Sequence, residues 1–117
     1  MRILVTGGAG FIGSNFTEYM IKKGSCRKIT VFDLMTYASN PDTILRFRKN
    51  RKFGFVKGDI RNRAAVQKAV AGHDAVVNFA AETHVDRSIM EPSVFTETNI
   101  KGAENLFLAA LKHKVKK

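Results

Sequence analysis

A glycine-rich turn between an apolar strand and a helix constrains the fold of this chain more than any other feature. The stretch TGGAGFIGSN follows directly on the apolar run at residues 3–5. Gly8, Gly10 and Gly13 satisfy the pattern G-x-G-x-x-G, and Gly7 offers an alternative first glycine. In that pattern the first glycine permits a tight turn, the second admits a pyrophosphate, and the third lets the helix pack closely. The turn therefore predicts a dinucleotide site, with a tight turn and nothing more as the alternative.

An acidic residue at the end of the second apolar run predicts which dinucleotide is bound. Asp33 lies about 20 residues after Gly13, the separation expected of a carboxylate that binds an adenosine ribose. A carboxylate there repels a 2′-phosphate, and the following Leu34 and Met35 offer no arginine to hold one. NAD is therefore favoured over NADP. The alternative is that Asp33 only solvates a loop.

Short, nearly continuous apolar runs alternate with helical patterns along the chain. Such runs are typical of parallel strands covered on both faces. Gly24 is expected to end the first helix, and Asn40 with Pro41 to begin the second. The order predicts an α/β fold, a Rossmann-like doubly wound parallel sheet, partial, with about four strands, in one domain over residues 1–117. The expected strands are Arg2–Thr6, Lys28–Phe32, Phe53–Lys57 and Ala75–Phe79, and the later helices are 42–50, 64–71 and one from Pro92 onward.

The last of these helices is expected to be long and to carry one continuous apolar side. Pro92 is well placed to open it, because proline suits the first helical position. The predicted apolar side comprises Val94, Phe95, Thr98, Ala103, Leu106, Phe107, Ala110 and Leu111.

Polar residues follow the third and fourth runs, at the edge of a parallel sheet where ligands bind. Gly58-Asp59-Ile60 follows the third run, and FAAETHVDRS closes the fourth, with two alanines that leave room for a flat group. Asp59 could instead cap the following helix. In the second stretch, Asp86 could pair with Arg87 and Ser88 could cap a helix.

The net charge of +10 raises the question whether the chain binds nucleic acid. The runs RFRKNRK and KHKVKK are strongly basic, but neither interleaves aromatic side chains suited to stacking bases. Nucleic-acid binding is therefore the lesser alternative. No apolar run approaches the ~20 residues of a membrane-spanning helix, and Cys26 is the only cysteine. We expect no membrane partner, no metal site, no disulfide, and a cytoplasmic location.

Taken together, these motifs resemble the extended short-chain dehydrogenases/reductases that act on nucleotide sugars. Two stretches are similar to the dTDP-glucose 4,6-dehydratases among them: VFDLMTYASN resembles a DxxTYAGN cofactor loop, and AAETHVDRSI resembles AAESHVDRSI. Leu34 and Ser39 depart from the lysine and glycine usual in that loop. UDP-sugar epimerases and dehydratases share the glycines and diverge at the second stretch. They remain the alternative, beside a non-catalytic dinucleotide-binding module.

The resemblance implies a role for each matching residue. NAD is the implied cofactor, dTDP-glucose the implied substrate, and a homodimer the implied assembly of the whole enzyme. Phe11 and Ile12 would lie against the pyrophosphate, Asp33, Leu34, Met35 and Thr36 at the ribose, Asp59 and Ile60 at the adenine, Phe79, Ala80, Ala81, Glu82 and Thr98 along the cofactor, and Thr83 and Arg87 at the substrate.

The resemblance also implies the reaction. NAD accepts a hydride from C4 of the glucosyl ring, water is lost across C5 and C6, and the hydride returns to C6. The Tyr/Lys and Asp/Glu pairs of this chemistry come later in the family, so we expect no catalytic residue in this chain. The chain is expected to be a fragment lacking the later strands and the sugar-binding domain, and inactive alone. Its one Y-x-x-x-K match, Tyr19 to Lys23, is predicted to be ordinary helix surface.

Overall fold

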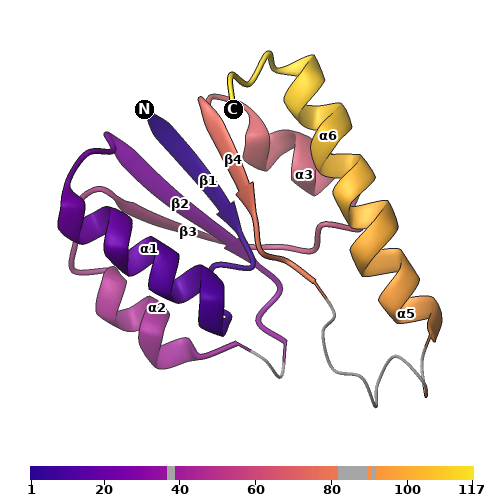
Figure 1. The fold of residues 1–117 in the computed structure, drawn as a ribbon, viewed down its shortest axis with the longest axis horizontal. Coiled ribbons are helices and arrows are strands. Elements are labelled where there is room, and N and C mark those ends of the chain that lie inside the picture. The colour runs from indigo at the N-terminus through magenta and orange to yellow at the C-terminus, as the bar shows by residue number, and fades with distance from the viewer. Residues whose placement is uncertain (37–38, 82–89, 91) are drawn as a thin grey trace.

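A computed structural model describes residues 1–36, 39–81, 90 and 92–117 of the chain. Over these residues it shows one parallel sheet of four strands, as predicted, and the strand order is β3-β2-β1-β4. Helices cover both faces of the sheet (Figure 1). The strands are β1 (Arg2–Thr6), β2 (Lys28–Asp33), β3 (Phe53–Lys57) and β4 (Ala75–Asn78), and the helices are α1 (Phe11–Lys23), α2 (Pro41–Phe47), α3 (Arg63–Val70), α5 (Pro92–Thr96), the π-helical turn η1 (Glu97–Lys101) and α6 (Gly102–Lys112).

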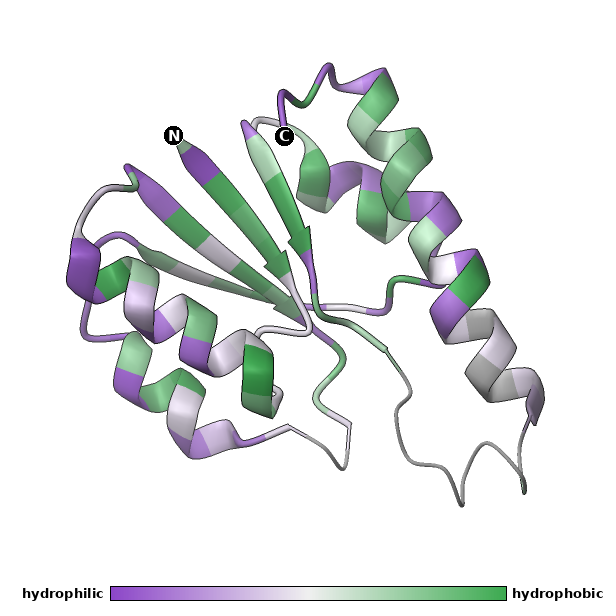
Figure 2. Ribbon diagram, in the orientation of Figure 1, coloured by the Kyte–Doolittle hydropathy of each residue, from purple (hydrophilic) through white to green (hydrophobic). Residues whose placement is uncertain are grey.

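Alternating side chains of the central strands build two hydrophobic cores, one on each face of the sheet. Ile3 and Val5 of β1 pack on the side of α1 and α2, whereas Leu4 packs on the side of α3 and α6. In β2, Val31 and Phe32 divide in the same way. Burial on both faces explains why the middle of these strands is largely apolar, which Figure 2 shows as green between purple or pale ends. The doubly wound arrangement therefore follows directly from the strand sequences.

The predicted helix caps are confirmed at two ends. Gly24 has a left-handed conformation (φ 68°), and its N–H donates to the carbonyls of Met20 and Ile21. The Asn40 side chain accepts a hydrogen bond from the main-chain N–H of Asp42, with Pro41 in the first helical turn. The second helix is shorter than expected, because it ends at Phe47 rather than at residue 50.

The start of α3 removes one alternative considered for Asp59. Asn62 is the N-cap of α3, and its side chain accepts a hydrogen bond from the N–H of Ala65 at 3.0 Å. The prediction that Asp59 caps this helix is therefore wrong. Asp59 is left to another partner, described below.

The expected single apolar side of the last helix is wrong beyond residue 101. The π-helical turn η1 separates α5 from α6, so the expected long helix is divided. Leu106 and Ala109 are buried, whereas Phe107 and Leu111 are 72% and 76% exposed. Two large side chains predicted to be core therefore lie on the surface.

The chain leaves α6 at Lys112 and turns back toward the sheet. Lys116 donates its main-chain N–H to the Asp74 carbonyl at 2.9 Å, and the Val76 N–H donates to the Lys117 carbonyl at 2.9 Å. These bonds lie along the outer edge of β4. No helix in the described ranges is long and apolar enough to span a membrane.

Candidate functional site

A cleft of about 360 Å³ lies at the carboxyl ends of the strands. The segments that follow all four strands contribute to it, together with η1, so residues far apart in the sequence meet there. This is the edge at which doubly wound sheets bind ligands. The residues lining the cleft are Gly7, Gly10, Phe32, Asp33, Leu34, Thr36, Ser39, Gly58, Asp59, Ile60, Arg61, Phe79, Ala80, Ala81 and Thr98.

Gly7 makes the tight turn at the end of β1. It has a left-handed conformation (φ 69°), and its N–H donates to the Phe32 carbonyl at 2.9 Å. A Cβ at Gly7 would lie 2.5 Å from both the Ala80 nitrogen and the Phe79 carbonyl carbon. The turn therefore packs directly against the backbone that follows β4, and no side chain fits between them.

The other glycines of the turn have different neighbours. A Cβ at Gly13 would overlap the Gly7 carbonyl oxygen and lie 2.8 Å from the Gly8 Cα, so α1 packs against the turn itself. Among the described residues, a Cβ at Gly10 would meet only the Gly7 oxygen, at 3.4 Å, and the backbone there is extended (φ −75°, ψ 176°). Gly10 is therefore open toward the cleft, at the N-terminus of α1, where free N–H groups favour an anion.

Asp33 joins the glycine turn to the loop that follows β2. Asp33 is buried, with 7% of its surface exposed. One carboxylate oxygen accepts the Ala9 N–H at 2.9 Å, and the other accepts the Met35 N–H at 2.7 Å and the Ser39 hydroxyl at 2.9 Å. The alternative that Asp33 only solvates a loop is wrong. Three donors among the described residues hold the carboxylate, and with about four lone pairs they leave an acceptor position on its first oxygen.

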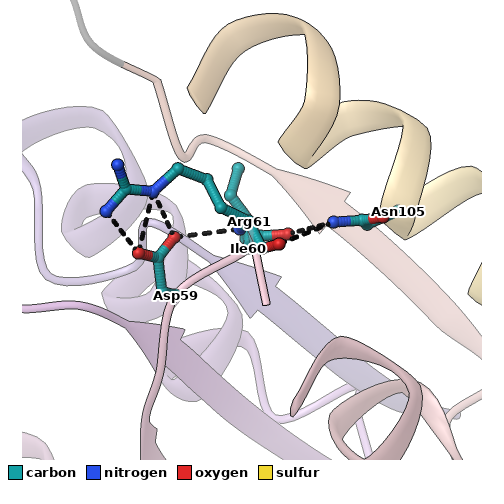
Figure 3. Close-up of polar contacts among 4 residues, drawn as sticks. All are labelled: Asp59, Ile60, Arg61 and Asn105. Atoms are coloured by element: carbon teal, nitrogen blue, oxygen red, sulfur yellow. Dashed lines mark hydrogen bonds and ion pairs between the residues drawn. The ribbon is translucent and has the colours of Figure 1, made fainter. Parts of the chain in front are cut away.

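Asp59 is held by Arg61 at the rim of the cleft (Figure 3). The Arg61 main-chain N–H and Nε donate to one carboxylate oxygen, at 2.9 and 3.1 Å, while Nε and Nη2 donate to the other, at 2.8 and 2.6 Å. Partial burial acts to raise the pKa of Asp59, but the hydrogen bonds and charge of Arg61 outweigh it and lower that pKa. The carboxylate is therefore kept ionised, as an acceptor only.

The structure brings most of the predicted cofactor residues together in the cleft. Met35 instead packs against the core on the α1 side, and Gly13 packs against the turn. Phe11 and Ile12 are 84% and 66% exposed and do not line the cleft. Glu82, Thr83, Arg87 and the alternatives at Asp86 and Ser88 lie outside the described residues, as does Tyr37.

Tyr19 and Lys23 also lie away from the cleft. Tyr19 is 58% exposed on α1, and the Lys23 ammonium sits 5.6 Å from the centroid of its ring. The pair is ordinary helix surface, as its position on α1 predicted.

Four residues of the cleft were missed by reasoning from the sequence. The sequence did indicate Gly58, since it begins the Gly-Asp-Ile stretch after the third strand. In the structure a Cβ at Gly58 would overlap the Phe32 ring. Phe32 lies near the end of an apolar strand, so its place in the sequence indicates a core residue and not a cleft residue. Ser39 and Arg61 had no signal, because loop conformation alone brings their side chains to the two carboxylates.

The fold and the cleft together define a class. A doubly wound parallel sheet, a glycine turn opening onto a helix N-terminus, and a buried carboxylate at the end of β2 are the features of a dinucleotide-binding protein. Comparison with known proteins places the chain more narrowly. The sequence model of the family described as GDP-mannose 4,6 dehydratase matches residues 4–117, and the chain belongs to that family.

The individual proteins that the chain is similar to are sugar-nucleotide enzymes, which is consistent with this family. The chain is 46% identical to a dTDP-glucose 4,6-dehydratase of Streptomyces niveus over 98% of its own length and 35% of the relative. The structure of the dTDP-glucose 4,6-dehydratase DesIV from Streptomyces venezuelae, with NAD bound, superposes with a TM-score of 0.94 at 42% identity, over 99% of this chain and 37% of that one. A UDP-glucose 4-epimerase of Thermus thermophilus in complex with NAD gives 0.85 at 30% identity, over 98% and 35%. The chain thus spans about a third of the length of these relatives.

Proposed function

We propose that residues 1–117 form the NAD-binding part of a dTDP-glucose 4,6-dehydratase. The observation that carries the proposal is the cleft in which a glycine turn and the buried Asp33 meet. The dehydratase structure that this chain matches over 99% of its length was solved with NAD bound, which supports the same cofactor here. The residues present fit the group: Gly10 leaves room for a pyrophosphate, and Asp33 has an acceptor position for a ribose hydroxyl.

Each part of the cleft is assigned to a part of the cofactor. The pyrophosphate lies over Gly10, where only the backbone of Phe11 and Ile12 approaches it, since their side chains point to solvent. The remaining assignments follow the cleft from the ribose to the nicotinamide end. Asp33, Leu34 and Thr36 surround the adenosine ribose, and Met35 belongs to the same loop but packs its side chain against the core. Asp59 and Ile60 surround the adenine, and Phe79, Ala80, Ala81, Glu82 and Thr98 the rest, with Thr83 and Arg87 at the sugar nucleotide.

The described residues bind and orient the cofactor. Bound NAD supplies a hydride acceptor for the sugar and a hydride donor for its return. Asp33 holds the ribose, and the α1 N-terminus offsets the charge of the pyrophosphate. The close packing of Gly7 against the backbone after β4 leaves no room for a side chain at this edge of the cleft. The proposed activity of the whole protein is the dehydration of dTDP-glucose to dTDP-4-keto-6-deoxyglucose.

A UDP-glucose epimerase is the second candidate within the family. Its cofactor half has the same fold, as the TM-score of 0.85 shows, but the identity is 30% against 42% for the dehydratase structure. The higher identity favours the dehydratase. Incubating the whole protein with dTDP-glucose or UDP-glucose and NAD+ separates the two, because only dehydration gives a 4-keto-6-deoxy product.

We also propose that the whole protein is a cytoplasmic homodimer. The exposed Phe107 and Leu111 of α6 support an apolar interface. The single cysteine, Cys26, is a buried free thiol, which is typical of a reducing compartment.

The assigned cofactor leads to a first prediction. The protein should bind NAD+ more tightly than NADP+, because Asp33 would face the 2′-phosphate with like charge. Asp33→Ala should weaken NAD+ binding by roughly 10- to 100-fold and reduce the preference for NAD+, since hydrogen bonds to a charged group are lost. Calorimetric titration of both proteins with both cofactors measures this.

Asp42→Ala is the matched control, because it removes a carboxylate exposed on α2. It should leave both affinities unchanged. Equal affinities of the unmodified protein for NAD+ and NADP+ would remove the role assigned to Asp33.

A further inference from the structure

The loop after β3, residues 58–61, is held from two directions. Within the loop, Arg61 binds the carboxylate of Asp59 with three N–H groups: its main-chain N, Nε and Nη2. From outside, the side chain of Asn105 on α6 donates to the carbonyls of Ile60 and Arg61, at 2.9 and 3.1 Å. Figure 3 shows both sets of contacts converging on this loop. The loop is therefore fixed both in its own conformation and in its position against α6.

Packing adds to the contact with α6. Ile60 is 4% exposed, and a Cβ at Gly102 would overlap its side chain, so loop and helix touch without a gap. Ile60 and Asn105 are more than 40 residues apart in the sequence. Because the loop has little freedom to shift, the direction in which Asp59 points is set before any ligand enters.

The three donors leave Asp59 with a defined capacity. An ionised carboxylate offers about four lone-pair positions and no donor. Arg61 brings three hydrogens to these positions, and its Nε hydrogen is shared between the two oxygens, so the hydrogens are one fewer than the lone pairs. Both residues line the cleft. A ligand in the cleft can therefore donate one N–H to this carboxylate. A ligand that places an oxygen acceptor there would instead face the negative charge with no hydrogen between the two oxygens.

We propose that Arg61 is a positioning residue for base selection: by orienting Asp59 as an acceptor, it makes the cleft select a purine that carries a 6-amino group over one that carries a 6-oxo group. Asn105 supports this selection by holding the Arg61 carbonyl. The inference rests on the proposed function, in which the adenine end of NAD lies beside Asp59. It adds a residue that sets specificity without itself being required to contact the base.

The test compares two dinucleotides that differ only at this position. NAD+ carries adenine, and nicotinamide hypoxanthine dinucleotide carries a 6-oxo purine. The unmodified protein should bind NAD+ at least about tenfold more tightly, as expected for one hydrogen bond to a charged group. Arg61→Ala should bring the ratio of the two dissociation constants down toward one, mostly by weakening NAD+. Titration calorimetry gives both constants, and circular dichroism confirms that the variant is folded.

Control variants separate the orienting effect of Arg61 from its charge and from a general loss of structure. Arg63→Ala removes the same charge from the exposed first residue of α3 and should keep the ratio of the unmodified protein. Arg61→Lys keeps the charge but lacks the planar fork, so it should recover only part of the ratio. Asn105→Ala should lower the ratio less than Arg61→Ala. A loss that is merely structural would weaken both dinucleotides equally and leave the ratio unchanged.

Three results would overturn the inference, and they differ from the failure of the proposed function. An unmodified protein that binds both dinucleotides equally does not select the base. A ratio unchanged in Arg61→Ala, or fully kept in Arg61→Lys, means that orientation by Arg61 plays no part. An unmodified protein that binds neither dinucleotide contradicts the proposed cofactor itself, and the inference with it.

Discussion

Gly7→Ala is expected to destabilise the folded chain by roughly 2–5 kcal/mol, a large share of the ~5–15 kcal/mol typical of a domain. Two costs add. The left-handed conformation of Gly7 costs an alanine about 1–2 kcal/mol. The added Cβ would also lie 2.5 Å from the backbone of Phe79 and Ala80, and backbone on both sides of the contact cannot move aside as a side chain could. Overpacking of this kind costs about 1–3 kcal/mol.

Gly24→Ala provides the matched control for this prediction. Gly24 has nearly the same conformation (φ 68°), but a Cβ there has no neighbour within 4 Å. It should therefore show the conformational cost alone. Urea unfolding followed by circular dichroism measures the free energy of unfolding of both variants. Equal destabilisation would mean that the turn does not press against the backbone after β4.

Gly10→Val is expected to abolish NAD+ binding while leaving the fold largely intact. In the part of the chain that the structure describes, a Cβ at this position has the Gly7 oxygen as its one neighbour, at 3.4 Å, and the extended backbone suits a β-branched residue. Losing glycine at a helix N-cap costs at most about 1 kcal/mol of stability. The isopropyl group, in contrast, would occupy the space assigned to the pyrophosphate.

Calorimetric titration with NAD+ measures the predicted loss of binding, and thermal unfolding measures whether the fold is kept. Gly10→Ala should fall between Gly10→Val and the unmodified protein in affinity, because its methyl group fills less of the space. Normal NAD+ affinity in Gly10→Val would place the pyrophosphate elsewhere. A variant that fails to fold would show that the open space beside Gly10 is needed by the protein itself.

Much of this architecture was predictable from local sequence, because local rules decide it. Continuous apolar runs predicted the buried strands, with β4 ending one residue earlier than expected and β2 one residue later. Gly24 and Asn40 predicted a helix end and a helix start, since only glycine takes a left-handed cap readily and an asparagine side chain can bind a free N–H. Asp33 was found through its distance from the glycine turn, a spacing that the βαβ unit imposes.

Other features depend on contacts between distant segments, and no local pattern carries them. Leu106 of α6 is buried and Phe107 is exposed although both fit one helical stripe, because only the contacts with the sheet and α3 decide which side of α6 is covered. Arg61 reaches Asp59 only because of the loop conformation, and Asn105 holds that loop from a helix more than 40 residues away.

The amino-acid sequence by itself thus determined the order of strands and helices, the glycine turn and the acid at the end of β2. Each of these depends on residues close together in the chain, where backbone sterics and side-chain periodicity decide the outcome. Only the tertiary structure decided which loop side chains meet in the cleft and which apolar residues of α6 remain exposed. Those depend on packing between segments, because a side chain's neighbours across a sheet edge are set by how the whole chain closes around its core.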